Sequence, residues 1–422
     1  MDLYYAFSML IIVATAFAYI NMRFLKLPST IGIMVIAILV SIAVVIIKKV
    51  TSAHPLSNFS TLIGHIDFTQ VLMGGMLNFL LFAGAININL KDLKEQKLPV
   101  IVFSSLSVII STFVVGFTLY FLLDVILPMV HIHHQVPLIY CLLFGALISP
   151  TDPVAVLGIL KEAKVSKSLE TKVAGESLFN DGVAVVVFTL LFNIAQGFES
   201  VHDLTFISVS WLLIKETVGG ILVGLALGEL GVYMMRQVKD YKVSVLITLS
   251  IVMGGYMIAY GMNISGPLTM VTAGLIIGDS RRKVLENHTL ETNYIGVFWE
   301  LIDEVLNAIL FLFIGFELLL IPNIGHYWAI GILGIIVVLF ARYVSIRIPT
   351  VIIPFKEKFS KGTITILVWG GLRGGVSIAL ALSLPQGPYK ETIIAITYFV
   401  VVFSIIVQGL SISKLAGKIN VQ

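Results

Sequence analysis

Four charged side chains stand inside long apolar stretches, where a charge is costly: Asp152, Glu176, Asp181 and Arg373. Three of them lie about 10 to 15 residues into hydrophobic segments, which at 1.5 Å per helical residue is close to the middle of a bilayer, and Glu176 lies slightly nearer one surface. An ionisable group at that depth costs at least ~2.5 kcal/mol, so each marks a candidate functional site. Three acids against one arginine leave excess negative charge, which favours binding of a cation or proton over purely structural pairing.

Two of these charges lie where a helix should break. Asp152 follows Thr151 and stands between Pro150 and Pro153, and two prolines three residues apart remove two backbone donors. Arg373 is surrounded by four glycines. A broken helix in mid-membrane persists only where its loose backbone groups line a cavity or face a partner. Two such breaks in corresponding halves of a chain indicate an inverted-repeat secondary transporter, with the broken helices crossing near the midplane.

The segment between these two breaks carries polar residues at helical spacing. Glu176 and Asn180 are four residues apart, and so are Ser177 and Asp181, so a helix places them on two adjacent strips of one side. A buried arginine keeps its proton and needs a carboxylate, and Glu176 is the nearest acid to Arg373 by depth. We therefore expect Glu176 and Arg373 to pair, which leaves Asp181 to bind a cation or a proton but not both.

The composition describes a membrane protein. Of 422 residues 58% are hydrophobic and only 12% are charged, whereas soluble domains carry about 25% charged residues. A net charge of +3 gives no reason to expect a nucleic-acid partner, the single Cys141 excludes a disulfide framework, and no nucleotide-binding P-loop is present. The sequence predicts an all-α polytopic membrane protein over residues 1–422, with no soluble domain and no cofactor.

Thirteen apolar segments can be marked, with the least secure boundary before residue 266. Lys and Arg accumulate in cytoplasmic loops, and with the N-terminus outside and the C-terminus inside, 20 of the 27 fall in inside loops. We therefore expect thirteen crossings, of which the fifth and twelfth are broken, in the inner membrane of a prokaryote. The segments are 4–22, 29–49, 69–89, 98–127, 137–160, 170–195, 205–234, 243–261, 266–279, 296–320, 327–352, 363–384 and 391–415.

Three motifs carry a family resemblance. The stretches Thr151-Asp152-Pro153, Gly175-Glu176-Ser177-Leu178-Phe179-Asn180-Asp181-Gly182 and Gly370-Gly371-Leu372-Arg373-Gly374 closely resemble signatures of the monovalent cation:proton antiporters, in the branch of the sodium/proton exchangers. The resemblance implies a homodimer whose protomers have a dimerisation part (roughly 1–89 and 205–320) and a mobile core (roughly 98–195 and 327–415) that moves like an elevator.

The same resemblance implies roles for single residues. Asp181 would be the carboxylate shared by Na⁺ and H⁺, and Asp152, Ser177 and the Thr151 backbone would help to hold the Na⁺. Glu176 would pair with Arg373. Asn180 beside Asp181 matches the variant that is typical of electroneutral, one-for-one exchange.

The sequence departs from the family pattern in one place. Several relatives carry a further acidic ligand on the third segment, where this chain has Ala83. The segment at 296–320 offers polar residues on one helical face, which we interpret as a cytoplasmic funnel for cations or as a neighbouring proton site. The alternative is internal pairing with Arg342 or Arg347. These residues are Glu300, Asp303, Glu304 and Asn307.

The function expected is secondary active exchange of Na⁺, and also Li⁺, for H⁺, without enzymatic activity. Exchange of K⁺ for H⁺ on the same scaffold and Na⁺-coupled symport of an organic solute remain the alternatives. The partners expected are monovalent cations, protons and membrane lipid. Three histidines in an outer loop, His131, His133 and His134, could bind zinc or sense pH, although loop histidines are commonly just solvated.

Overall fold

The chain is helical throughout the part that its computed structural model describes, and no strand occurs there. His131, His133 and His134 lie outside the described residues. The described residues are 3–50, 71–126, 136–153, 156–158, 160, 165–196, 206–238, 240–287, 293–319, 321, 324–356 and 359–418.

The helices follow the apolar segments of the sequence, and each of the thirteen segments contains a described helix. The α-helices are α1 (Leu3–Ile20), α2 (Ser29–Val50), α5 (Leu77–Asn87), α6 (Leu90–Glu95), α7 (Lys97–Ile101), α8 (Ser107–Tyr120), α10 (Leu138–Ile148), α12 (Lys167–Ala195), α13 (Phe206–Arg236), α14 (Tyr241–Met262), α15 (Gly266–Asn287), α16 (Tyr294–Phe316), α17 (Trp328–Ile352), α18 (Lys361–Trp369), α19 (Gly375–Leu382), α20 (Lys390–Phe403) and α21 (Gly409–Lys418). π-Helical and 3₁₀ turns lie between or beside them at η1 (Asn21–Leu25), η2 (Leu72–Met76), η3 (Val102–Leu106), η4 (Phe121–Ile126), η6 (Glu317–Leu319), η7 (Ile324–Tyr327) and η8 (Ser404–Gln408).

Eight helical spans among the described residues are long and apolar enough to cross a membrane, and two shorter apolar helices accompany them. The all-α membrane fold is therefore confirmed. The count of thirteen crossings and the orientation of the termini stay predictions.

Helix α15 extends beyond the apolar segment that predicted it, because its last two turns are polar. Arg282 in this extension donates hydrogen bonds to the carbonyls of Asn87 (3.1 Å) and Ile88 (3.1 Å), at the end of α5. Basic side chains can satisfy carbonyls that a helix end leaves without partners. Arg282, which the charge pattern predicts to lie in a cytoplasmic loop, therefore lies on α15 and caps the end of α5.

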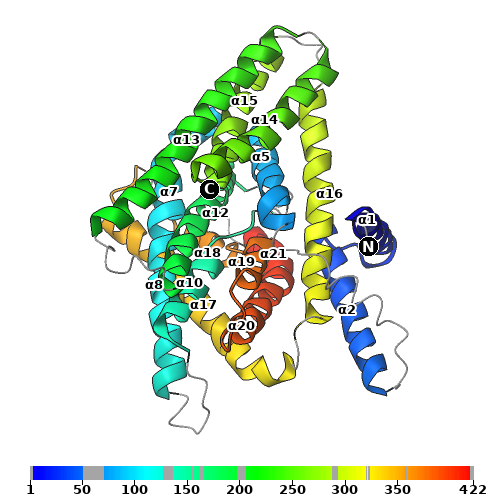
Figure 1. Cartoon of the computed structure of the whole chain (residues 1–422), viewed down its shortest axis with the longest axis vertical. Helices are drawn as coiled ribbons and strands as arrows, with labels where there is room; N and C mark the ends of the chain where they lie inside the picture. The colour runs from blue at the N-terminus through cyan, green and yellow to red at the C-terminus, as the bar shows by residue number, and fades with distance from the viewer. Residues whose placement is uncertain are drawn as a thin grey trace.

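Two clusters of buried apolar side chains hold the helices together. The larger cluster joins α2, α8, α10, the second half of α16, α17, α19 and α20, and the smaller joins α5, α14 and α15 around Trp299. Figure 1 shows α13, α14 and α15 side by side at one end of the molecule, with α16 running beside them toward α2. The larger cluster joins α2 and α16, which belong to the predicted dimerisation part, with α10 and α17, which belong to the predicted core. The packing therefore does not separate the two parts, and this division stays a prediction.

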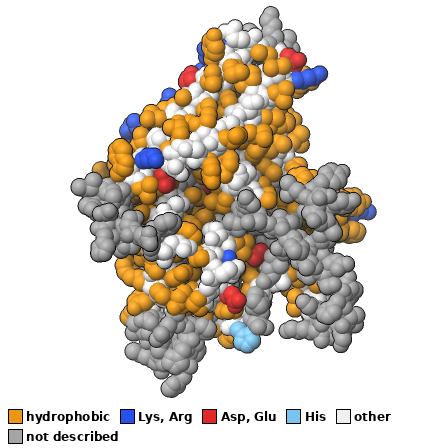
Figure 2. All heavy atoms as spheres, in the orientation of Figure 1, with side chains coloured by type: hydrophobic (Ala, Val, Ile, Leu, Met, Phe, Trp, Pro, Cys, Tyr) orange, Lys and Arg blue, Asp and Glu red, His pale blue; other side chains and the backbone are white. Residues whose placement is uncertain are grey.

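The outer face of this helix group is apolar. Figure 2 shows hydrophobic side chains over α13, α14 and α15, with the charged side chains mostly toward the edges. Trp211, Leu222 and Tyr233 of α13 and Met257 and Tyr260 of α14 are all exposed. An exposed apolar surface of this kind suits lipid chains or another membrane protein, not water. The chain is a multi-pass integral membrane protein.

Candidate cation-binding site

Two helices break in the middle of the molecule, and their extended stretches meet. Helix α10 ends at Ile148 before the two prolines, and the glycine-rich stretch 370–374 separates α18 from α19. The backbone N–H of Asp152 donates a 2.7 Å hydrogen bond to the carbonyl of Leu372. A Cβ atom on Gly374 would lie 2.6 Å from Oδ2 of Asp152, so only glycine fits there. The predicted crossing of two broken helices is confirmed.

Charged side chains lie against the helix ends at this crossing. The guanidinium of Arg373 donates to the carbonyls of Ser149 and Pro150, at the carboxyl end of α10. Gly374, which contacts the Asp152 carboxylate, is the N-cap residue of α19. The carboxyl end of a helix carries partial negative charge and the amino end partial positive charge. Each half-helix end therefore faces a side chain of the opposite sign.

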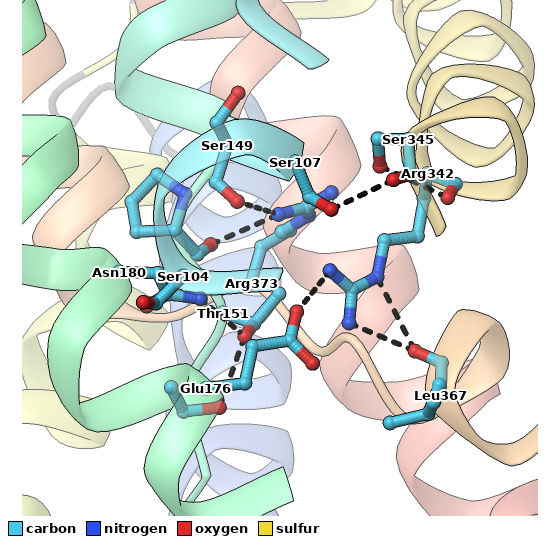
Figure 3. Close-up of polar contacts among 12 residues, drawn as sticks. Ser104, Ser107, Ser149, Thr151, Glu176, Asn180, Arg342, Ser345, Leu367 and Arg373 are labelled. Carbon is cyan, nitrogen blue, oxygen red and sulfur yellow. Dashed lines mark hydrogen bonds and ion pairs between the residues drawn. The ribbon is translucent and has the colours of Figure 1, made fainter. Parts of the chain in front are cut away.

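The expected ion pair between Glu176 and Arg373 is wrong. Glu176 instead pairs with Arg342 of α17, and both side chains are buried. Nε and Nη2 of Arg342 also donate to the carbonyl of Leu367 in α18, at 3.2 and 2.8 Å, as Figure 3 shows. The prediction compared only how deep Glu176 and Arg373 lie in the membrane, and equal depth does not show which helices are neighbours. A guanidinium next to an unwound helix can also be satisfied by free carbonyls, so Arg373 did not require an acid.

Helix α12 presents its polar strip to the crossing, as its spacing predicted. The hydroxyls of Thr151 and Ser177 are 3.0 Å apart. The side-chain amide of Asn180 donates to the Thr151 hydroxyl at 2.8 Å, as Figure 3 shows. Thr151, Ser177 and Asn180 are almost fully buried, and Asp181 is only 9% exposed. Asn180 therefore holds the Thr151 side chain in place, and its own Oδ1 has no partner among the described residues.

A cavity of about 470 Å³ reaches this network. Its wall includes the oxygen-bearing residues Asp152, Asp181, Thr151 and Ser177, together with Ala83 of α5. The cavity wall also includes residues at the helix ends that the distribution of Lys and Arg predicts to be cytoplasmic. These residues are Asn89, Asp92, Lys167 and Glu170.

The polar face of α16 also lines this cavity. Glu300 and Glu304 are exposed, Asp303 is half-buried and Asn307 is buried. Arg342, one of the alternative partners for these acids, is paired with Glu176. Arg347, the other alternative partner, is exposed. The interpretation of the α16 acids as a funnel or a neighbouring proton site stays a prediction.

Two braces of the broken helix were not foreseen. The Ser404 hydroxyl accepts a 2.7 Å hydrogen bond from the backbone N–H of Arg373, and Nε2 of Gln408 donates to the carbonyl of Trp369 at 3.0 Å. Both braces belong to the π-helical turn η8, whose wider winding interrupts the usual hydrogen-bond ladder. The polar residues of this segment were visible in the sequence, but a π-turn leaves no clear pattern there.

Known proteins resemble the chain along nearly its whole length. The sequence model for "Sodium/hydrogen exchanger, transmembrane" matches residues 11–418. The chain belongs to the sodium/hydrogen exchanger family. This exchanger is 43% identical to the Na(+)/H(+) antiporter NhaP of Pseudomonas aeruginosa, over 99% of this chain and 97% of that protein. It is 35% identical to the Na(+)/H(+) antiporter NhaH of Halobacillus aidingensis, over 84% of each chain.

A solved structure shares the fold of this exchanger. The sodium proton antiporter MjNhaP1 from Methanocaldococcus jannaschii superimposes with a TM-score of 0.75 over 99% of both chains, at 19% sequence identity. The family assigns the exchanger to the secondary transporters and not to the enzymes.

Proposed function

We propose that this exchanger moves Na⁺, and also Li⁺, out of the cytoplasm in exchange for external H⁺ across the inner membrane. The observation that carries the proposal is the closed end of the cavity, where the Asp152 and Asp181 carboxylates lie with the oxygens of Thr151 and Ser177. Carboxylates and hydroxyls are hard oxygen ligands, which suit small alkali cations. The names of the relatives, Na(+)/H(+) antiporters, support this choice of ions.

Competition for Asp181 couples the two fluxes. A carboxylate that holds a proton, or one that holds Na⁺, is close to neutral, whereas the bare charge is costly to move through the membrane. Since one site cannot hold both ions, each passage in one direction carries Na⁺ and each return carries H⁺. Glu176 pairs with Arg342 and Arg373 binds main-chain carbonyls, so neither group takes part in the exchange. With one proton exchanged for one Na⁺ at Asp181, transport should be electroneutral.

The crossing should move as one body. Hydrogen bonds between the 149–153 and 370–374 stretches, together with the Ser404 and Gln408 braces, tie four helix ends to each other. In the proposed cycle this body carries the ion past a static part of a homodimer within the lipid, as in an elevator. The acids of α16 concentrate cations at the cytoplasmic mouth of the cavity by their charge.

The test is a pH-jump assay in proteoliposomes, with Na⁺, Li⁺ or K⁺ added in turn. Na⁺ and Li⁺ should collapse the proton gradient, and Asp181→Ala should abolish the response because it removes the carboxylate for which Na⁺ and H⁺ compete. A full response in Asp181→Ala would overturn the site, and a response to K⁺ alone would favour the K⁺/H⁺ alternative. Rates should not change when valinomycin and K⁺ set a membrane potential, and strong voltage dependence would contradict electroneutral exchange.

A further inference from the structure

Ser377 has a hydroxyl with nothing to bind. It lies in the first turn of α19, is 1% exposed, and its Oγ has no hydrogen-bond partner among the described residues. The residue also lines the cavity that reaches Asp152 and Asp181. A buried hydroxyl without a partner is unfavourable and calls for an explanation, such as a water or an ion that the site binds.

The broken helix explains why this hydroxyl is free. Serine and threonine in a helix usually donate to the carbonyl three or four residues earlier, as Ser383 does to Leu380 (2.7 Å) and Thr397 does to Ile393 (2.7 Å). Arg373 and Gly374, four and three residues before Ser377, both precede the first residue of α19, and neither carbonyl accepts a hydrogen bond from the Ser377 hydroxyl. The usual acceptors are therefore not in reach. Ser111 of α8 also lacks a partner, but it does not line this cavity.

The surroundings of Ser377 indicate a cation and not an anion. Gly374, one helical turn before Ser377, contacts the Asp152 carboxylate, and Asp181 lines the same cavity. Two carboxylates repel an anion and attract a cation. Ala83 also lines this cavity, and its side chain supplies no oxygen to a cation.

We propose that the Ser377 hydroxyl oxygen is a ligand of the transported cation. The proposal rests on the function proposed above and adds a residue from α19 to the ligands from the 149–153 stretch and α12.

The experiment compares Ser377→Ala with Ser377→Thr, which keeps a hydroxyl, in proteoliposomes over a range of Na⁺ concentrations. The apparent KM for Na⁺ should rise about fivefold to tenfold in Ser377→Ala, with little change in maximal rate, and should stay near the wild-type value in Ser377→Thr. Ser383→Ala is the matched control, because Ser383 is the C-cap residue of α19, its hydroxyl already donates to the carbonyl of Leu380, and it lines a different cleft. Its KM should not change.

A binding measurement separates a ligand from a structural role. Na⁺ should raise the Tm of the purified wild-type protein, and Ser377→Ala should need several times more Na⁺ for the same shift. An unchanged KM and an unchanged Na⁺ titration in Ser377→Ala would overturn the proposal, and so would a lower maximal rate at constant KM. If the wild-type protein itself shows no response to Na⁺, the proposed function fails, which is a distinct result from failure at Ser377 alone.

Discussion

Glu176 and Asp181 lie five residues apart on α12 and have opposite surroundings. Glu176 is fully buried against an arginine, whereas Asp181 lines a cavity together with a second carboxylate, Asp152. A buried carboxylate with an ionic partner ties together the helices that carry the two charges. Two carboxylates that line one cavity attract a mobile cation. The partner of each acid, more than its depth, therefore decides its role.

The pair of Glu176 and Arg342 should be visible in stability. Arg342→Met strands a buried carboxylate, so it should destabilise the protein by about 3–5 kcal/mol, and adding Glu176→Gln should restore part of this loss. Thermal unfolding in detergent measures both variants. As the control, Glu176→Gln should not rescue Arg373→Met, because Arg373 binds carbonyls. If the double variant with Arg342→Met is no more stable than the single one, the pairing has no energetic role.

The crossing of the two broken helices depends on how closely the unwound stretches 149–153 and 370–374 approach each other. The carbonyl of Leu372 and the N–H of Asp152 are joined directly, and Gly374 leaves room for the Asp152 carboxylate. Proline and glycine serve different purposes here. The prolines end α10, whereas the glycines allow contact between backbone and side chain.

Gly374→Ala should therefore disrupt the site. The added methyl group would lie 2.6 Å from Oδ2 of Asp152, so the carboxylate must move, and Na⁺-driven proton movement should fall at least about tenfold. Gly254→Ala in α14 is the matched control, since a Cβ there has nothing within 4 Å, and its activity should match the wild type. Proteoliposome transport and detergent-solubilised yield check both. Wild-type rates in Gly374→Ala would show that the crossing tolerates a shift of Asp152.

For the whole molecule, the sequence was sufficient to predict most of the architecture. Apolar segments and proline and glycine breaks predicted the helices and the crossing, because burial and backbone chemistry act locally. The lateral neighbours of α12 could not be predicted, since residue counts give depth but not which helix packs beside which. Glu176 was therefore assigned to Arg373 instead of Arg342. The braces from Ser404 and Gln408 were missed for a similar reason, because the π-turn that aims them follows from packing.

The direction in which the cavity opens gives a test of topology. Glu304 lines the cavity that reaches Asp181. A cysteine at this position (Glu304→Cys) should react with a membrane-impermeant thiol reagent from the cytoplasmic side only. Gln386→Cys lines a separate cleft beside α14 and α20 and should react from the outside only. The chain's own Cys141 is fully buried and gives a low background. Labelling of inside-out and right-side-out vesicles measures this, and the reverse pattern would invert the orientation.

The contact between Arg373 and the end of α10 has a consequence for how this sequence can vary. The carbonyls of Ser149 and Pro150 that hold the guanidinium belong to the main chain, and every amino acid supplies such a group. Exchanging the Ser149 side chain leaves the acceptors in place, whereas inserting or deleting one residue before Asp152 would move them out of reach. Selection on this contact should therefore act on the number of residues before Asp152, and on the proline that ends α10, more strictly than on the side chain at Ser149.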